Sequence, residues 1–366
     1  MVNEIGSEFW LNSTPDEYNK YDEYKNEIPE WISKFGNVVL TLSGRGAISL
    51  LLKEIKVREK IALLPAYICE SVILPFIQSG YTCYFYSVDT DLTPNQDNII
   101  SNYADIGVFV HMGYYGYPTN YGLQDIIKHL KQKSVIIVED ITQTLFSDYQ
   151  RFEENDYYVA SLRKWVGLPG GGFLASPKKD IKNPPRQSNE TFVKMRQEAL
   201  TLKGRYISGG GKNLKPKYLE LFSKSEELLS KDYEPYCMDD LSKALISKLD
   251  ILQLKEKRCT NFRTLAYGMK YINYVEPVFS GLLSNVCPMF YPVYIKNIRD
   301  EVQQVLIQNQ IYCPIHWPVP RQLKLDKFKN TLSIYKNILS IPCDQRYDSS
   351  DMERVVSTLM GIRGGY

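Results

Sequence analysis

The sequence predicts an α/β protein built on a mostly parallel sheet, followed by a smaller α+β unit. From about residue 38 to about 176, short apolar runs alternate with amphipathic stretches of helical period, and the runs are apolar on both faces. Strands of that kind lie in parallel sheets covered by helices. From about residue 236, helical patterns interleave with a few short strands, which indicates a second unit.

The first half of the chain supplies strands and helices in alternation. A strand is expected at NVVLTL, a helix from Ser43 to Ile55, and a further strand at KIALLPA. The series continues with SVILPFIQSG, TCYFYSV, IGVFVHM, the helical LQDIIKHLKQ, SVIIVED, DYYVASL and GGFLAS. Strand and helix signals in turn favour the α/β class over an all-α or all-β fold.

The second half changes character at residue 177, where the chain becomes polar and rich in lysine. Two helical patterns flank GGGKNLKPK at 209–217, and we expect a surface insertion or a bridge here. One long helical pattern then runs from LSKAL to AYGM, followed by FYPVYI, a helix from Arg299 to Asn309, IYCPI, LSIPC and a last helix near Ser350. We therefore expect an N-terminal segment (1–34), a large α/β domain (35–235) and a small α+β domain (236–366).

Charge and composition exclude several classes of protein. Forty-four Lys and Arg residues against 42 Asp and Glu give a net charge of +2, which offers no bulk field for nucleic acid or an anionic membrane. No stretch approaches the roughly 20 apolar residues that span a bilayer, and MVNEIGSEFW lacks a secretory run, so a cytoplasmic protein is expected. Seven scattered cysteines without a C-x-x-C pair, and three separated histidines, argue against a disulfide framework and a metal site.

The stretch LSGRGA, at 42–47, resembles the start of an anion-binding helix. Ser43 can cap the helix, and its free amides, with Gly44 and the charge of Arg45, would hold a phosphate. It is not a dinucleotide fingerprint, because Ile48 and Ser49 stand where a third glycine is needed. An ordinary capped helix is the alternative.

Two further stretches place polar residues where strands end. VIIVEDITQTL, at 135–145, delivers Glu139 and Asp140 to the end of a strand, with Gln143 one turn on. SLRKWVGLPGGG, at 161–172, sets an arginine and a lysine before a run of glycines that lets a backbone come close to something. Open α/β sheets bind ligands at this edge. The alternatives are a carboxylate that only caps a helix and a lysine that is only solvated.

The order of these features along the chain resembles that of pyridoxal-phosphate enzymes of the aspartate aminotransferase fold. The similarity is greatest to the sugar aminotransferases of the DegT/DnrJ/EryC1/StrS family, across nearly the whole length. The stretches that carry it are SGRGA at 43–47, PAYICESV at 65–72, EDITQ at 139–143, SLRKW at 161–165 and IYCPIHWP at 311–318. The serine and lysine of S-L-R-K stand closer together than is usual in that family.

The resemblance implies a role for each residue. Lys164 would form the Schiff base with the cofactor aldehyde and later move the substrate proton, with Arg163 and partial burial keeping its amine neutral. Asp140 would pair with the pyridine nitrogen. The remaining implied cofactor contacts are Gln143 to the ring hydroxyl, Ser161, Arg163 and the amides around Gly44 and Arg45 to the phosphate, and Cys69 at the ring-stacking position, with Tyr67 nearby. His316 is a candidate substrate contact, and His111 a weaker candidate for the pocket floor.

The resemblance also implies the reaction. It predicts a homodimeric aminotransferase that moves an amino group from glutamate or glutamine onto a nucleotide-linked keto sugar in surface-polysaccharide biosynthesis. One alternative is another reaction on the same cofactor, such as decarboxylation or dehydration of a small amino acid or sugar. A second is a non-catalytic scaffold that keeps the fold, although retention of Asp140, Gln143 and Lys164 together speaks against it.

Overall fold

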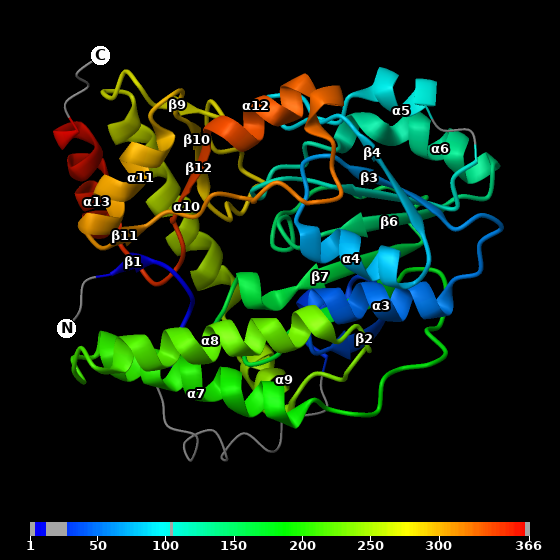
Figure 1. The fold of residues 1–366 in the computed structure, drawn as a ribbon, viewed down its shortest axis with the longest axis horizontal. Coiled ribbons are helices and arrows are strands. Elements are labelled where there is room, and N and C mark those ends of the chain that lie inside the picture. Colours follow the sequence, from blue (N-terminus) through cyan, green and yellow to red (C-terminus); the bar gives the residue numbers. More distant parts are fainter. Residues whose placement is uncertain (1–3, 12–27, 103–104, 363–366) are drawn as a thin grey trace.

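A computed structural model describes residues 4–11, 28–102 and 105–362 of the chain. Its centre is a seven-stranded sheet of order β2-β8-β7-β6-β5-β3-β4 (Figure 1). The strands are β2 (Asn37–Thr41), β3 (Ile61–Pro65), β4 (Thr82–Tyr86), β5 (Val108–Met112), β6 (Ile136–Asp140), β7 (Tyr157–Ser161) and β8 (Gly172–Ser176). Only β8 runs antiparallel to its neighbours, so the predicted, mostly parallel sheet is confirmed.

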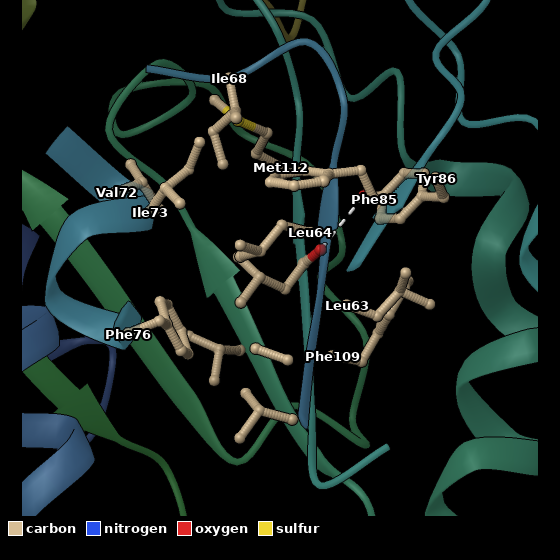
Figure 2. Close-up of a cluster of buried hydrophobic side chains, with 14 of the residues drawn as sticks. Leu63, Leu64, Ile68, Val72, Ile73, Phe76, Phe85, Tyr86, Phe109 and Met112 are labelled. Atoms are coloured by element: carbon tan, nitrogen blue, oxygen red, sulfur yellow. Dashed lines mark hydrogen bonds between the residues drawn. The ribbon is translucent and has the colours of Figure 1, made fainter. Parts of the chain in front are cut away.

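Helices cover this sheet because their apolar faces match its buried strands. All five residues of β5 are buried, as expected for a central parallel strand. The helices of the first half are α2 (Glu30–Ser33), α3 (Gly44–Glu54), α4 (Glu70–Gln78), α5 (Gln96–Asn102), the short η2 (Tyr121–Leu123) and α6 (Gln124–Gln132). Figure 2 shows Val72, Ile73 and Phe76 of α4 facing the side of β3 that carries Leu64.

The polar stretch after β8 forms two long antiparallel helices, α7 (Glu190–Ile207) and α8 (Leu214–Lys231). The GGGKN segment separates them, and Gly211 there has a φ of +106°, a left-handed conformation that glycine adopts without strain. Figure 1 shows the pair lying side by side, with α8 running from below β1 toward α3. The single long helix predicted next is wrong. The chain forms α9 (Asp240–Ser247) and α10 (Ile251–Met269), because Asp250 caps a new helix by accepting from the Gln253 amide at 2.9 Å.

A second core lies around a three-stranded antiparallel sheet of order β12-β10-β9. Its strands are β9 (Glu276–Pro277), β10 (Tyr291–Tyr294) and β12 (Ile338–Ile341). Around it lie α11 (Arg299–Gln308), η4 (Leu325–Lys327), α12 (Lys329–Asn337) and α13 (Ser349–Gly361). The N-terminal strand β1 (Ile5–Gly6) pairs in parallel with β11 (Ile311–Tyr312), so the start of the chain lies on this second unit.

Helix α10 joins the two units. Its Leu254 belongs to the same buried cluster as Trp165, which follows β7, and Phe173 of β8, whereas Phe262 and Leu265 belong to the second core. Among the described residues, no helix combines the length and the apolar character needed to cross a membrane.

Candidate active site

One cleft collects the residues proposed from the sequence. It lies at the carboxyl ends of β6 and β7 and at the start of α3. Its lining includes Gly44, Arg45, Cys69, Asp140, Gln143, Ser161, Arg163, Lys164 and His316. Other lining residues, which the sequence did not single out, are Ser71, Met112, Tyr115, Thr142, Glu226, Leu229, Phe290 and Trp317.

The start of α3 forms a cationic end of the cleft. The Ser43 hydroxyl caps the helix by accepting from the Gly46 amide at 3.0 Å. The Nε and Nη1 atoms of Arg45 are buried and have no hydrogen-bond partner among the described residues. Because a buried donor without a partner costs free energy, these atoms are suited to an anion.

The glycine run forms the other side of this end. Gly171 donates to the Leu42 carbonyl at 2.6 Å, and Gly172 lies against the backbone of Ser43 and Gly44. A Cβ on Gly172 would stand 2.3 Å from the Ser43 carbonyl carbon. The strand therefore approaches the helix start closely because it has no side chain there.

Asp140 and Glu139 point to opposite faces of the sheet, as consecutive strand residues do. Asp140 lines the cleft, its Oδ1 accepts from the Thr142 amide at 2.8 Å, and burial raises its pKa. Glu139 is buried on the other face, where Arg151 lies 2.6 Å and the Asn155 amide 2.8 Å from its oxygens. Asp140 is therefore the carboxylate available to a ligand.

His111 shares the face of Glu139, because the two residues are register partners in β5 and β6. It is fully buried, within hydrogen-bond distance of Asn155 at 2.9 Å and of Asn120 at 2.8 Å, and burial lowers its pKa. The residues that line the cleft do not include it. The interpretation of His111 as part of the pocket floor is therefore wrong, and His111 belongs to a polar network beneath the sheet.

Gln143 is held with its amide nitrogen available. Its Oε1 accepts from the Tyr115 backbone amide at 2.7 Å, which leaves Nε2 without a hydrogen-bond partner in the described part of the chain. The Tyr115 hydroxyl in turn lies 3.1 Å from the Ser340 hydroxyl of the small unit. Gln143 can therefore donate a hydrogen bond into the cleft.

Aromatic rings reach the cleft from positions other than the expected one. Cys69 lines it, and its sulfur accepts from the Ser71 hydroxyl at 3.0 Å. Tyr67 is fully buried behind the wall, where its ring lies 5.1 Å from that of Trp317 and its hydroxyl bonds the His316 carbonyl. Trp317 itself lines the cleft, as do Phe290 of the small unit and Tyr115 of the large one.

Lys164 ends the short 3₁₀ helix η3 (Leu162–Lys164). Thr142 ties this turn to the end of β6, because its hydroxyl accepts from the Ser161 amide at 3.0 Å and its carbonyl from the Trp165 indole at 2.7 Å. Lys164 is exposed, and among the described residues no hydrogen bond or ion pair ends on its amine. Its amine is therefore free of described protein partners in the cleft that Lys164 lines.

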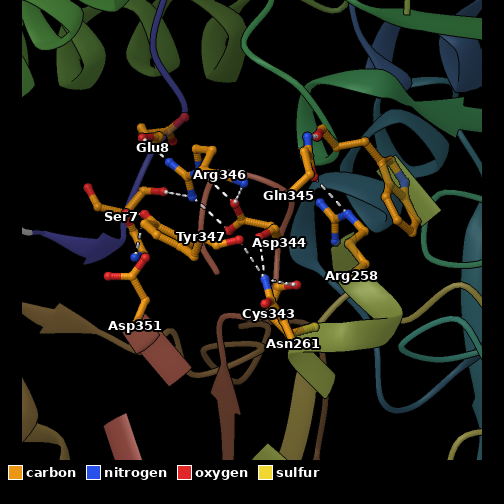
Figure 3. A network of polar contacts seen from close by, with 12 residues as sticks. Ser7, Glu8, Arg258, Asn261, Cys343, Asp344, Gln345, Arg346, Tyr347 and Asp351 are labelled. Carbon is orange, nitrogen blue, oxygen red and sulfur yellow. Dashed lines mark hydrogen bonds and ion pairs between the residues drawn. The ribbon is translucent and has the colours of Figure 1, made fainter. Parts of the chain in front are cut away.

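Trp165 anchors the same turn to the small unit. Its side chain is fully buried, with the Arg258 guanidinium 4.5 Å from the ring centroid. The Gln345 amide donates to the Trp165 carbonyl at 2.7 Å and accepts from Arg258 at 2.8 Å, the pair seen in Figure 3. Both units therefore fix the backbone next to Lys164.

Arg163 is already paired. Its Nη1 lies 2.8 Å from Glu226 Oε1 on α8, while its Nε is buried without a partner among the described residues. The polar stretch at 177–235, expected as an insertion or bridge, thus contributes Glu226 and Leu229 to the cleft wall. No local pattern distinguished Glu226 from the other acidic residues of that helix.

His316 lines the cleft in its neutral form. Its Nδ1 is 2.8 Å from the Ser340 hydroxyl, and its ring packs edge-on to Phe290 at 4.8 Å. Burial, with a smaller contribution from the charge of Lys164, lowers its pKa to about 3. At neutral pH it can therefore accept or donate a hydrogen bond but carries no charge.

No family model and no curated protein sequence matches this chain. Several solved structures are similar to it. "Helicobacter pylori PseC, aminotransferase involved in the biosynthesis of pseudoaminic acid" has a TM-score of 0.69 and 14% identity, with 98% of each chain covered. A DegT DnrJ EryC1 StrS aminotransferase from Brucella abortus has a TM-score of 0.64 and 14% identity, with 95% of each chain covered. CalS13, a sugar aminotransferase from Micromonospora echinospora, has a TM-score of 0.66 and 14% identity, with 99% of this chain and 100% of that chain covered.

This chain has the fold of these aminotransferases. The aspartate aminotransferase architecture expected from the sequence is thereby confirmed, including the large sheet followed by a smaller α+β unit. At such low identity the likeness establishes the fold and not the reaction.

Proposed function

We propose that this protein is a pyridoxal-phosphate-dependent aminotransferase. One observation carries the proposal: Lys164, Asp140 and the start of α3 line a single cleft. They come from the loop after β7, the end of β6 and the loop after β2. An amine, a buried carboxylate and a cationic helix start are the three groups that this cofactor needs.

The residues present fit the cofactor. Arg45 offers buried donors that lack a partner among the described residues, which suits a phosphate, and Ser161 and the Gly44 amide lie in the same wall. Asp140 is buried without an ion-pair partner in the described part of the chain, and burial raises its pKa, which suits a cationic ring nitrogen. Gln143 Nε2 suits a ring hydroxyl.

Bound pyridoxal phosphate would supply an electron sink for charge that develops at the substrate Cα. Lys164 would hold the aldehyde carbon of the cofactor before the substrate enters, and its freed amine would then carry the proton between the substrate Cα and that cofactor carbon. Its exposed position on η3 leaves the amine mobile enough for both tasks. Asp140 would keep the ring nitrogen protonated, because a buried carboxylate stabilises a neighbouring cation. Phe290 and Trp317 would limit the access of water from the mouth.

The substrate class is part of the proposal. We infer a keto sugar linked to a nucleotide as acceptor and glutamate or glutamine as donor, in surface-polysaccharide biosynthesis. The support is the shared fold with PseC and CalS13, which are described as acting in pseudoaminic acid biosynthesis and as a sugar aminotransferase. A cytoplasmic homodimer is proposed on the same ground.

Absorbance of the purified protein mixed with the cofactor tests the reaction class. A band near about 410–430 nm that borohydride removes is expected for wild type and absent in Lys164→Ala. Lys178→Ala is the matched control, because Lys178 is also exposed but lies outside the cleft lining. Addition of glutamate should then abolish the band. A band that no amino donor alters would favour the other cofactor reactions, and a wild type without any band would favour the scaffold.

A further inference from the structure

The inner side of α8 brings a carboxylate to Lys164. Glu226 and Leu229 stand three residues apart, on one face of the helix, and both line the cleft together with Lys164. The Glu226 side chain is 46% exposed, so it borders the open part of the cleft and not the core. Helix α8 lies at the edge of the fold in Figure 1. Water alone could therefore solvate this carboxylate without any protein partner.

Two arginines nevertheless hold Glu226. Its Oε1 accepts from Arg163 at 2.8 Å and from Arg196 of α7 at 3.3 Å. Arg196 is 2% exposed, and its Nη2 also pairs with Glu8 of the N-terminal segment at 3.2 Å. Charges of opposite sign therefore alternate from the N-terminal segment to the turn that carries Lys164.

The N-terminal end of this chain of charges is itself fixed. Arg346 of the small unit donates to the Glu8 carbonyl at 3.0 Å and is paired with Asp344 at 2.7 Å, as Figure 3 shows. Lys203 of α7 also donates to the Glu8 carbonyl. Glu8 and Glu226 are thus held from different parts of the fold, so the surrounding structure fixes the position of Glu226 in the cleft wall.

Glu226 stays ionised under ordinary conditions. Burial opposes its charge, but Arg163, Arg196 and Lys164 outweigh burial and lower its pKa to about 2. The same cations lower the pKa of Glu8 against the effect of burial. The charged side chains that line the cleft with Lys164 are Arg45 from α3, Asp140 from β6, Arg163 from η3 and Glu226 from α8, together with the neutral His316. Arg196 of α7 pairs with Glu226, and Glu8 of the N-terminal segment pairs with Arg196 in turn.

We propose that Glu226 is a positioning residue of the active site, which fixes the Arg163 guanidinium and places a negative charge beside the reactive nitrogen of Lys164. This inference rests on the proposed function. Arg163 was expected to keep the Lys164 amine neutral through its positive charge, and its pairing with Glu226 changes that role. Because Glu226 already pairs with that guanidinium, the arginine does not act on Lys164 as an isolated positive charge.

A pH titration of the visible absorption band tests this role. Glu226→Gln keeps the size of the side chain and removes its charge, so the midpoint should move to lower pH, by roughly 0.5–1 unit for a partly exposed site. Glu227→Gln is the matched control, because Glu227 neighbours it on α8 but pairs with Lys231 at the surface. Its midpoint should equal that of wild type. Glu226→Asp, which keeps the charge, should leave the midpoint close to that of wild type.

The outcomes separate this inference from the proposed function. A wild-type protein without a visible band overturns both. A band whose midpoint is the same in wild type and Glu226→Gln overturns only the role of Glu226. Should Glu226→Gln not accumulate as folded protein, Glu8→Gln removes the neighbouring carboxylate and should shift the midpoint in the same direction. An unchanged midpoint in that variant would then overturn the charge argument.

Discussion

Gly172→Ala should disrupt the cationic end of the cleft, which the start of α3 forms. Gly172 starts β8 and is the register partner of Thr41 on one side and Ser161 on the other. An added Cβ would lie 2.3 Å from the Ser43 carbonyl carbon and 2.5 Å from the Gly44 nitrogen, whereas ordinary contact begins at 3.4 Å. All the atoms it meets are backbone, so the strand and the helix start must separate by about 1 Å.

The cost has two parts. Overpacking of this kind destabilises a protein by about 1–3 kcal/mol. A displacement of about 1 Å also lengthens a hydrogen bond beyond its useful range. Each hydrogen bond to a charged phosphate contributes about 1.5–3 kcal/mol, so the loss of one or two of them lowers the affinity for pyridoxal phosphate at least tenfold. Urea unfolding measures the first part, and titration of the apoprotein with pyridoxal phosphate measures the second.

Gly281→Ala is the control, because a Cβ there meets nothing within 4 Å. It should leave both the unfolding midpoint and the cofactor affinity unchanged. If Gly172→Ala behaves like this control, the close approach of β8 to Ser43 is not the reason for the glycine. If both variants lose the same stability, the loss comes from replacing glycine and not from the contact.

Three further predictions separate site from scaffold. Asp140→Asn should weaken cofactor binding about 10- to 100-fold by titration, since a charge-assisted hydrogen bond is lost, with little change in the urea midpoint. Glu139→Gln should do the reverse: it breaks a buried pair with Arg151, so the free energy of unfolding should fall by about 3–5 kcal/mol while the folded fraction binds normally. His316 is neutral in the folded protein down to a pH of about 3, whereas an unfolded histidine takes up a proton below about pH 6.5. As pH falls from about 6.5 toward 3, this residue should therefore lower the stability of wild type by up to about 1.4 kcal/mol per pH unit. Urea unfolding at pH 7 and pH 4.5 should show this loss in wild type and not in His316→Gln.

Periodicity was enough to predict the large sheet but not the direction of each strand. The run GGFLAS is as apolar as its neighbours, and all five residues of β8 are buried, yet β8 alone runs antiparallel. A strand buried on both faces gives no signal for direction, because either orientation buries the same side chains. The break between α9 and α10 was detectable in principle, since Asp250 is a good capping residue inside an otherwise continuous helical pattern.

The sequence of a strand end does not show on which face of the sheet each side chain lies. Glu139 and Asp140 are adjacent, so one of them must face each side of the sheet, but the strand alone does not say which. Distant partners decide it: Arg151 and Asn155 complete a polar network around Glu139. The same argument explains why His111 was misplaced, because its face follows from its register with β6.

Most of the residues found from sequence share one property: apart from His316, they lie at or just after the end of a strand or at the start of a helix. Parallel strands bring their carboxyl ends to one edge, so Asp140 and Lys164 meet without further information. Glu226 reaches the cleft by another route, through the packing of α7 against α8, and Glu8 of the N-terminal segment pairs with the same Arg196 that holds it. Topology therefore fixes which strand-end groups meet in the cleft, whereas long-range packing sets the charges around them.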